Sequence, residues 1–199
     1  MVFHKYRLIC TGIPKNASSS IFDILKNSTD QSHDHHTIIQ DFQNNDPDLM
    51  ETYTRFCIVR NPYDRFFSGC HQIRRDNSEN NNKTVKEIIE QELKLEYWNE
   101  VFIPQHKFIT FGNQILISNI LSYENLEEDW FNFASEYNKT AEFKIKKQLP
   151  RRNSTEERIP WKNELEELST EHWEMLNHMY EKDFKLFNYE IILPKNDHN

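Results

Sequence analysis

Apolar residues occur along this chain in two patterns, short continuous runs and runs with helical spacing. Residues 6–10, 54–59 and 114–121 are apolar runs of strand length, which predict three buried strands. Apolar positions at helical spacing predict a helix that opens at residues 21–25, and further helices are expected at residues 84–96, 124–137 and 162–187. Pro47 suits the first position of a short helix through Tyr53, and Pro62 ends a strand and precedes another helix. Residues 101–109 are expected to be irregular. Strands that alternate with helices favour a single α/β domain with a short, mostly parallel central sheet flanked by helices.

The loop that joins the first strand to the first helix is rich in hydrogen-bond donors. Its sequence is Ile13-Pro14-Lys15-Asn16-Ala17-Ser18-Ser19-Ser20. The first amide groups of a helix have no partner within the helix, and the helix dipole favours negative charge there. Three hydroxyl groups and one lysine add donors and positive charge, so the loop predicts a phosphate site. A serine-rich helix start is also typical of a simple N-cap, and that interpretation stays open.

This loop is not a Walker A motif. That motif needs a glycine immediately before its lysine and a serine or threonine directly after it. Here Gly12 stands alone, and Asn16 and Ala17 separate Lys15 from the serines. The sequence therefore disfavours an ordinary ATP-dependent phosphoryl transferase.

A second anion-binding pattern follows the strand at residues 54–59. Arg60 comes directly after the strand, Pro62 ends it, and the helix that follows carries Ser68 about two turns further along. Ligands of open α/β sheets bind at the carboxyl ends of the strands. The guanidinium of Arg60 and the hydroxyl of Ser68 are therefore expected to bind one anion.

Composition limits the class of protein. The chain has 199 residues with 14 Phe, 8 Tyr and 4 Trp, so we expect one folded domain over residues 1–199. A net charge of −8 argues against general nucleic-acid binding and against a basic membrane-surface protein. The three cysteines, an odd number, favour structural thiols in a reducing compartment, and nothing around them resembles a thiol-enzyme signature.

The sequence also bears on location. No apolar run approaches the roughly 18 residues of a membrane span, and no signal peptide is visible. A glycan on the Asn16 sequon would obstruct the predicted phosphate loop. We therefore expect a cytoplasmic protein.

The two anion-binding motifs resemble those of the sulfotransferases, specifically the Golgi-type carbohydrate sulfotransferase superfamily and its bacterial and viral relatives. Residues 14–20 resemble their 5′-phosphosulfate loop, and residues 59–68 resemble their 3′-phosphate motif with the spacing from Arg60 to Ser68 kept. Further matches follow in the family's order at residues 104–105, 122–129, 152–158 and 180–189. The resemblance covers nearly the whole chain and implies a P-loop-like three-layer sandwich.

The resemblance also implies the donor and its binding residues. The donor is 3′-phosphoadenosine 5′-phosphosulfate (PAPS), the product is 3′-phosphoadenosine 5′-phosphate (PAP), and no metal is needed. Lys15 would stabilise charge on the bridging oxygen of the leaving phosphate, and a loop near Arg158 would close over the nucleotide. The implied donor-binding residues are Pro14, Lys15, Asn16, Ala17, Ser18, Ser19, Ser20, Arg60, Ser68, Asn153, Ser154 and Arg158. The residues support this donor independently, because it carries two separated anionic groups and the sequence offers two separated anion sites.

Transfer to a hydroxyl requires a general base with a pKa near neutral. His36 is the candidate, because heparan-type members place a catalytic histidine between the two phosphate motifs and residues 36–42 resemble that region. Many relatives have a histidine just before the Pro-Gln segment, where this chain has Val101. The alternative bases are His33, His35, Glu100 and His106. The histidine cluster also suits a solvated loop, and less well a zinc site, because no fourth ligand at a suitable spacing is present.

The sequence leaves three functions open. The first is an active sulfotransferase whose acceptor is a glycan hydroxyl, as the resemblance implies, with a peptide tyrosine or a small metabolite still open. The second is a catalytically silent nucleotide-binding or interaction protein, and the third is a divergent phosphoryl transferase. Lys15 together with a plausible base favours the first over the second. Arg60 together with Ser68 favours it over the third.

Overall fold

The computed structural model describes residues 1–26, 38–76, 82–92, 99–149 and 168–193. These residues group into two compact units, Met1–Arg60 with Gln105–Ser154 and Asn61–Pro104 with Thr155–Asn199. Each unit is described by itself. The prediction of one domain over residues 1–199 stays a prediction.

The first unit is built on a four-stranded sheet. Its strands are β1 (Val2–Phe3), β2 (Leu8–Thr11), β3 (Thr54–Val59) and β6 (Asn119–Ser122), in the order β1-β2-β3-β6. β2, β3 and β6 are parallel, and β1 is antiparallel to β2. Cys10 pairs with Phe56, and Ile58 pairs with Leu121, so the three parallel strands end at the same edge of the sheet.

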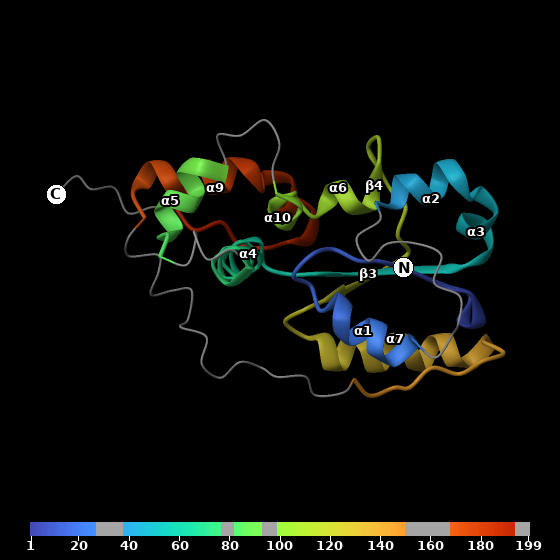
Figure 1. Cartoon of the computed structure of the whole chain (residues 1–199). Coiled ribbons are helices and arrows are strands. Elements are labelled where there is room, and N and C mark those ends of the chain that lie inside the picture. Colours follow the sequence, from blue (N-terminus) through green and yellow to red (C-terminus); the bar gives the residue numbers. More distant parts are fainter. Residues whose placement is uncertain (27–37, 77–81, 93–98, 150–167, 194–199) are drawn as a thin grey trace. The chain divides into compact units, whose positions relative to one another are not determined.

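Helices cover both faces of this sheet (Figure 1). α1 (Ser18–Leu25) and α7 (Leu126–Thr140) lie on one face, and α2 (Ile39–Asn45), α3 (Pro47–Thr52) and α6 (His106–Ile109) lie on the other. A 3₁₀ turn η1 (His4–Tyr6) and a hairpin of β4 (Thr110–Phe111) and β5 (Gln114–Ile115) complete the unit. The predicted α/β fold, with a mostly parallel sheet flanked by helices, is confirmed.

The core of the first unit follows from the alternation of side chains along the strands. Phe56 and Ile58 point to the face that α1 and α7 cover, and they join a buried cluster with Ile21, Leu25 and Trp130. Phe56 and Trp130 are both fully buried, with ring centroids 5.9 Å apart. The intervening strand residues Ile9, Cys57 and Val59 are also buried, because the opposite face carries helices too. Both faces therefore select apolar side chains, which is why the strands read as continuous apolar runs.

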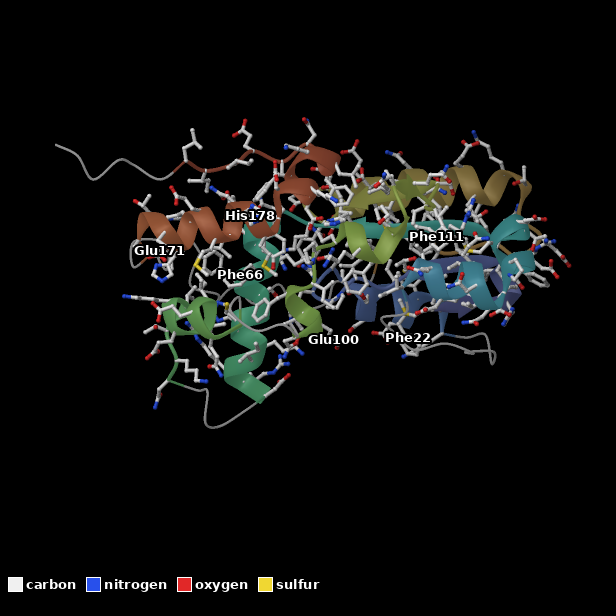
Figure 2. All side chains as sticks on the ribbon, turned by 90° about the horizontal axis from the view of Figure 1, so that it is seen from above. Phe22, Phe66, Glu100, Phe111, Glu171 and His178 are labelled. Carbon is white, nitrogen blue, oxygen red and sulfur yellow. The ribbon has the colours of Figure 1, made fainter. Side chains whose placement is uncertain are left out.

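The second unit consists of helices. They are α4 (Pro62–Asp76), α5 (Val85–Glu92), η3 (Glu100–Phe102), α9 (Thr170–Met179) and α10 (Glu181–Phe187). Asn61 caps α4, since its Oδ1 accepts from the backbone N–H of Tyr63 at 2.9 Å, and Pro62 occupies the first position of the helix. Phe66, labelled in Figure 2, is fully buried on α4 in the aromatic cluster of this unit.

Three predicted elements differ from the structure. The strand predicted at residues 114–121 is wrong as a single strand. Gly112, at φ +59°, allows a tight turn through which β5 pairs back onto β4, and the chain joins the main sheet only at Asn119. Residues 101–109 contain η3 and α6 and are not irregular throughout. The helix predicted at residues 162–187 is two helices that meet at Tyr180, and residues 162–167 lie outside the described part.

Other predicted boundaries shift by a few residues. β3 agrees with its prediction, and the helix predicted at residues 124–137 is α7. The helix predicted at residues 84–96 is α5, and residues 93–96 of that prediction lie outside the described part. Within the described ranges, the helices are too short or too polar to span a membrane.

Candidate functional site

The loop between β2 and α1 holds two residues in the left-handed backbone region. Lys15 has φ 71° and Ala17 has φ 59°. This conformation costs a non-glycine residue about 1–2 kcal/mol, and such strain clusters at ligand sites. Left-handed residues that alternate with right-handed ones turn successive N–H groups toward one point, which creates an anion-binding concavity. The strained loop therefore supports the predicted phosphate site.

The start of α1 answers the question of whether its serines are simple caps. The N-cap residue is Ala17, and no side chain caps the helix. Backbone bonding begins with Ser20 and Ile21, whose N–H groups both donate to Ala17 O, so the amides of Ser18 and Ser19 come ahead of the helical ladder. Alanine is a poor N-cap because it has no oxygen to accept from those amides. The two amides therefore precede the bonded part of the helix, which is where an anion binds at a helix N-terminus.

The remaining loop side chains hold the loop in place. Ser18 Oγ donates to Ile13 O at 3.1 Å. Asn16 is 1% exposed, and its Nδ2 donates to Ile58 O on β3 at 2.8 Å. Within the described residues, the buried Oδ1 of Asn16 and Oγ1 of Thr11 have no hydrogen-bond partner, which is typical where a water or a ligand completes a site.

Arg60 reaches back from the end of β3 to this loop. Its Nη1 donates to Lys15 O at 3.3 Å, and its guanidinium carbon lies 4.3 Å from the centroid of the Tyr123 ring. Tyr123 follows β6 directly and is fixed by its N–H, which donates to Val59 O at 2.7 Å. The guanidinium of Arg60, at the carboxyl edge of the sheet, is thus held between the loop from β2 to α1 and the aromatic face of Tyr123.

The predicted partner of Arg60 belongs to the second unit. Ser68 lies on α4 and is 6% exposed, among the buried side chains of that helix. Whether Ser68 contributes to a 3′-phosphate site with Arg60 stays a prediction.

Several predicted site residues fall outside the described part of the chain. These are His33, His35, His36, Asn153, Ser154 and Arg158. Of the alternative bases, Glu100 is exposed on η3 in the second unit. His106 is half-buried on α6 in the first unit, next to the buried Gln105.

The cysteines have the properties of structural residues. Cys10, Cys57 and Cys70 are free and buried. Burial raises the pKa of the Cys10 thiol to about 12 and raises that of Cys57 well above its ordinary value. Both thiols stay protonated near neutral pH and are poor nucleophiles. Within the described ranges, histidine, cysteine and acidic side chains form no cluster of three that suits a metal ion.

The last of the matching segments, residues 180–189, contains buried residues that pack the second unit. Tyr180 is fully buried, and its hydroxyl donates to Phe102 O at 2.9 Å. Burial raises the pKa of the Tyr180 phenol, while the adjacent Arg65 opposes this and Asp183 adds to it. Arg65 and Asp183 are themselves fully buried, which charged side chains tolerate only with partners nearby. These residues stabilise the second unit, and nothing in their surroundings assigns them to the chemistry.

Two residues of the site were not identified from the sequence. Tyr123 follows the third parallel strand at the ligand edge of the sheet, a position that the edge rule for α/β sheets could have indicated. Gln105 was noted only as part of a matching segment, although it is fully buried and bonds to both Asn16 and Arg60. Its partners are 89 and 45 residues away in sequence, so local pattern gives no signal for them.

The site has two elements with the chemistry to bind an anion, the loop with the first amides of α1 and the guanidinium of Arg60, which donates to the same loop. These elements fit a nucleotide with two separate phosphate groups. Comparisons with curated proteins and with solved structures gave no match. The model of the sulfotransferase family matches residues 1–190, and that family uses PAPS as its donor. The chain therefore belongs to the sulfotransferase family and is, by family, a PAPS-dependent enzyme.

Proposed function

We propose that the enzyme transfers the sulfuryl group of PAPS to a carbohydrate hydroxyl by in-line displacement with a general base. One observation carries the proposal. Arg60, from the 3′-phosphate motif, donates to the backbone of Lys15 in the 5′-phosphosulfate loop, so the arginine of one motif and the loop of the other meet within the first unit. A donor with a phosphate at each end of its ribose matches that pairing.

The loop binds the 5′ end of the donor. The amides of Ser18 and Ser19 and the hydroxyls of Ser19 and Ser20 bind the 5′ phosphate, and the helix dipole adds to that attraction. The Ser18 hydroxyl holds the loop through its bond to Ile13 O. Lys15 stabilises the charge that develops on the bridging oxygen as the phosphate leaves. Arg60, with Ser68 as its predicted partner, binds the 3′ phosphate.

The reaction forms one bond and breaks one bond. The acceptor oxygen bonds to sulfur while the bond from sulfur to the bridging phosphate oxygen breaks, and that oxygen keeps the electron pair as PAP departs. The proton of the acceptor hydroxyl passes to the base, for which we propose His36. Two alternative bases, Glu100 and His106, lie in the described residues, and His106 is the preferred one because it adjoins Gln105 in the first unit.

A carbohydrate acceptor is supported by the resemblance to carbohydrate sulfotransferases. Arg74, Arg75, Arg151 and Arg152 could form a basic rim that favours an acidic glycan, and Arg151 and Arg152 lie outside the described residues. Arg74 and Arg75 already have partners in the structure. Arg74 Nε donates to Lys83 O at 2.8 Å, and Arg75 pairs with Asp76 at 2.9 Å. We therefore propose a neutral or weakly charged glycan.

The test is transfer of labelled sulfate from PAPS to a panel of neutral glycans, sulfated glycans, a tyrosine peptide and simple phenols. The expected result is label in a neutral glycan. His36→Ala should lose turnover and still bind PAP, and His106→Ala is the matched control that keeps turnover. Label confined to the peptide or the phenols contradicts the glycan proposal. Full turnover by His36→Ala, with loss in His106→Ala, would move the base to His106.

A further inference from the structure

Gln105 connects the end of β3 to the phosphate loop. It is fully buried, and its side-chain amide pairs with the backbone of Arg60 at both ends. Nε2 donates to Arg60 O at 2.8 Å, and Oε1 accepts from Arg60 N–H at 2.9 Å. This is the exchange of bonds that a neighbouring strand would make, and it fixes the backbone from which the Arg60 side chain extends.

The same amide oxygen also holds the loop. Gln105 Oε1 accepts a second bond, from Asn16 Nδ2 at 2.7 Å, and the other hydrogen of Asn16 Nδ2 goes to Ile58 O. Reversing the Gln105 amide would place its NH₂ group against the N–H of Arg60 and the NH₂ group of Asn16. The network therefore permits one orientation of this amide.

These contacts close a ring. Arg60 Nη1 donates to Lys15 O, Lys15 is joined covalently to Asn16, Asn16 bonds to Gln105, and Gln105 bonds to the backbone of Arg60. Movement of Arg60 relative to the loop would break partly buried bonds of Arg60 or the buried bond between Asn16 and Gln105, and buried polar groups are costly to leave without partners.

We propose that Gln105 is a positioning residue that sets the spacing between the two phosphate-binding elements. The proposal rests on the proposed function, because it assigns the 3′ phosphate to Arg60 and the 5′ phosphate to the loop. Gln105 does not touch the donor. It determines how much the 3′ phosphate adds to the affinity of the protein for a nucleotide that already carries a 5′ phosphate.

The test compares adenosine 5′-monophosphate with PAP by titration calorimetry on the folded full-length protein. Their affinity ratio measures what the 3′ phosphate contributes. Gln105→Met keeps the length of the side chain and removes its hydrogen bonds, and the ratio is expected to fall by about 10-fold to 100-fold. Gln114→Met is the matched control, because Gln114 is exposed on β5 in the same unit, and its ratio should equal that of the wild type.

A double-mutant cycle separates positioning from simple destabilisation. Asn16→Ala removes the loop side of the same bond, so Asn16→Ala with Gln105→Met should lower the ratio little further than one substitution alone. A purely structural role for Gln105 would lower the unfolding temperature and leave the affinity ratio unchanged. That outcome overturns the inference.

Failure of the proposed function has a different result. If the wild type binds PAP no more tightly than the monophosphate, the two-phosphate site itself is wrong. If the wild type prefers PAP and Gln105→Met prefers it equally, only the positioning role is wrong. Where Gln105→Met fails to fold, Gln105→Glu keeps the acceptor oxygen and loses the donor to Arg60 O. A wild-type ratio in that variant contradicts the proposal.

Discussion

Replacing Tyr123 with alanine tests the arrangement that holds Arg60. The Arg60 guanidinium lies 4.3 Å from the centre of the Tyr123 ring, and both side chains are half-buried. A cation–π contact of this kind contributes about 0.5–1 kcal/mol when exposed and about 2 kcal/mol when desolvated, so a half-buried pair contributes about 1–2 kcal/mol. Since about 1.4 kcal/mol corresponds to a factor of ten, Tyr123→Ala should weaken PAP binding about 5-fold to 30-fold.

The assay is calorimetric titration of Tyr123→Ala, Tyr123→Phe and the wild type with PAP and with adenosine 5′-monophosphate. Tyr123→Phe keeps the aromatic face and should bind PAP within about twofold of the wild type. Tyr53→Ala is the matched control, because the Arg7 guanidinium lies 5.7 Å from the Tyr53 ring at the opposite, amino-terminal edge of the strands. Unchanged PAP affinity in Tyr123→Ala, or an equal loss for the monophosphate, would refute the reasoning.

Three further predictions concern the chemistry and the second unit. Lys15→Ala should lower kcat about 10²-fold to 10³-fold in a labelled-PAPS assay. Lys26→Ala is the matched control, because Lys26 is exposed at the opposite, carboxyl-terminal end of α1, and it should keep the wild-type kcat. Equal rates for Lys15→Ala and the wild type would remove Lys15 from the reaction. Gly69→Ala should reduce the free energy of unfolding by about 1–3 kcal/mol in urea titrations. The reason is that a Cβ at Gly69 would lie 2.8 Å from the Phe102 ring. A variant more stable than the wild type contradicts this packing. Tyr180→Phe removes a buried hydroxyl donor and should lower the free energy of unfolding by about 0.5–1.5 kcal/mol in the same titration. Its kcat should stay unchanged. A loss of kcat without loss of stability would give Tyr180 a catalytic role.

Elements with a strong local pattern were predictable. β3 agrees with its prediction at both ends, because a buried parallel strand reads as one apolar run and Asn61-Pro62 marks the next helix. The run at residues 114–121 is similar in composition, but Gly112 allows a hairpin that uses its first residues. Apolar content therefore identified β6 and could not give its starting residue.

The candidate site was likewise predictable only in part. The loop and Arg60 were identifiable, because both follow buried strands and carry anion-binding chemistry. That Ala17 is the N-cap of α1 depends on backbone angles, which the sequence does not give. Tyr123 and Gln105 act through contacts between segments that are distant in sequence. Such contacts arise only once the sheet has brought the strand ends together, so no periodicity predicts them.

The central claim is that the loop and Arg60 bind a nucleotide with a 3′ phosphate. The most direct measurement is thermal unfolding of the full chain with PAP, ADP or ATP at equal concentration. A ligand at about one hundred times its dissociation constant adds about 2.7 kcal/mol of stability. The account predicts a clear rise in unfolding temperature with PAP and a much smaller one with ADP and ATP. No shift with PAP, or a larger shift with ATP, would contradict it.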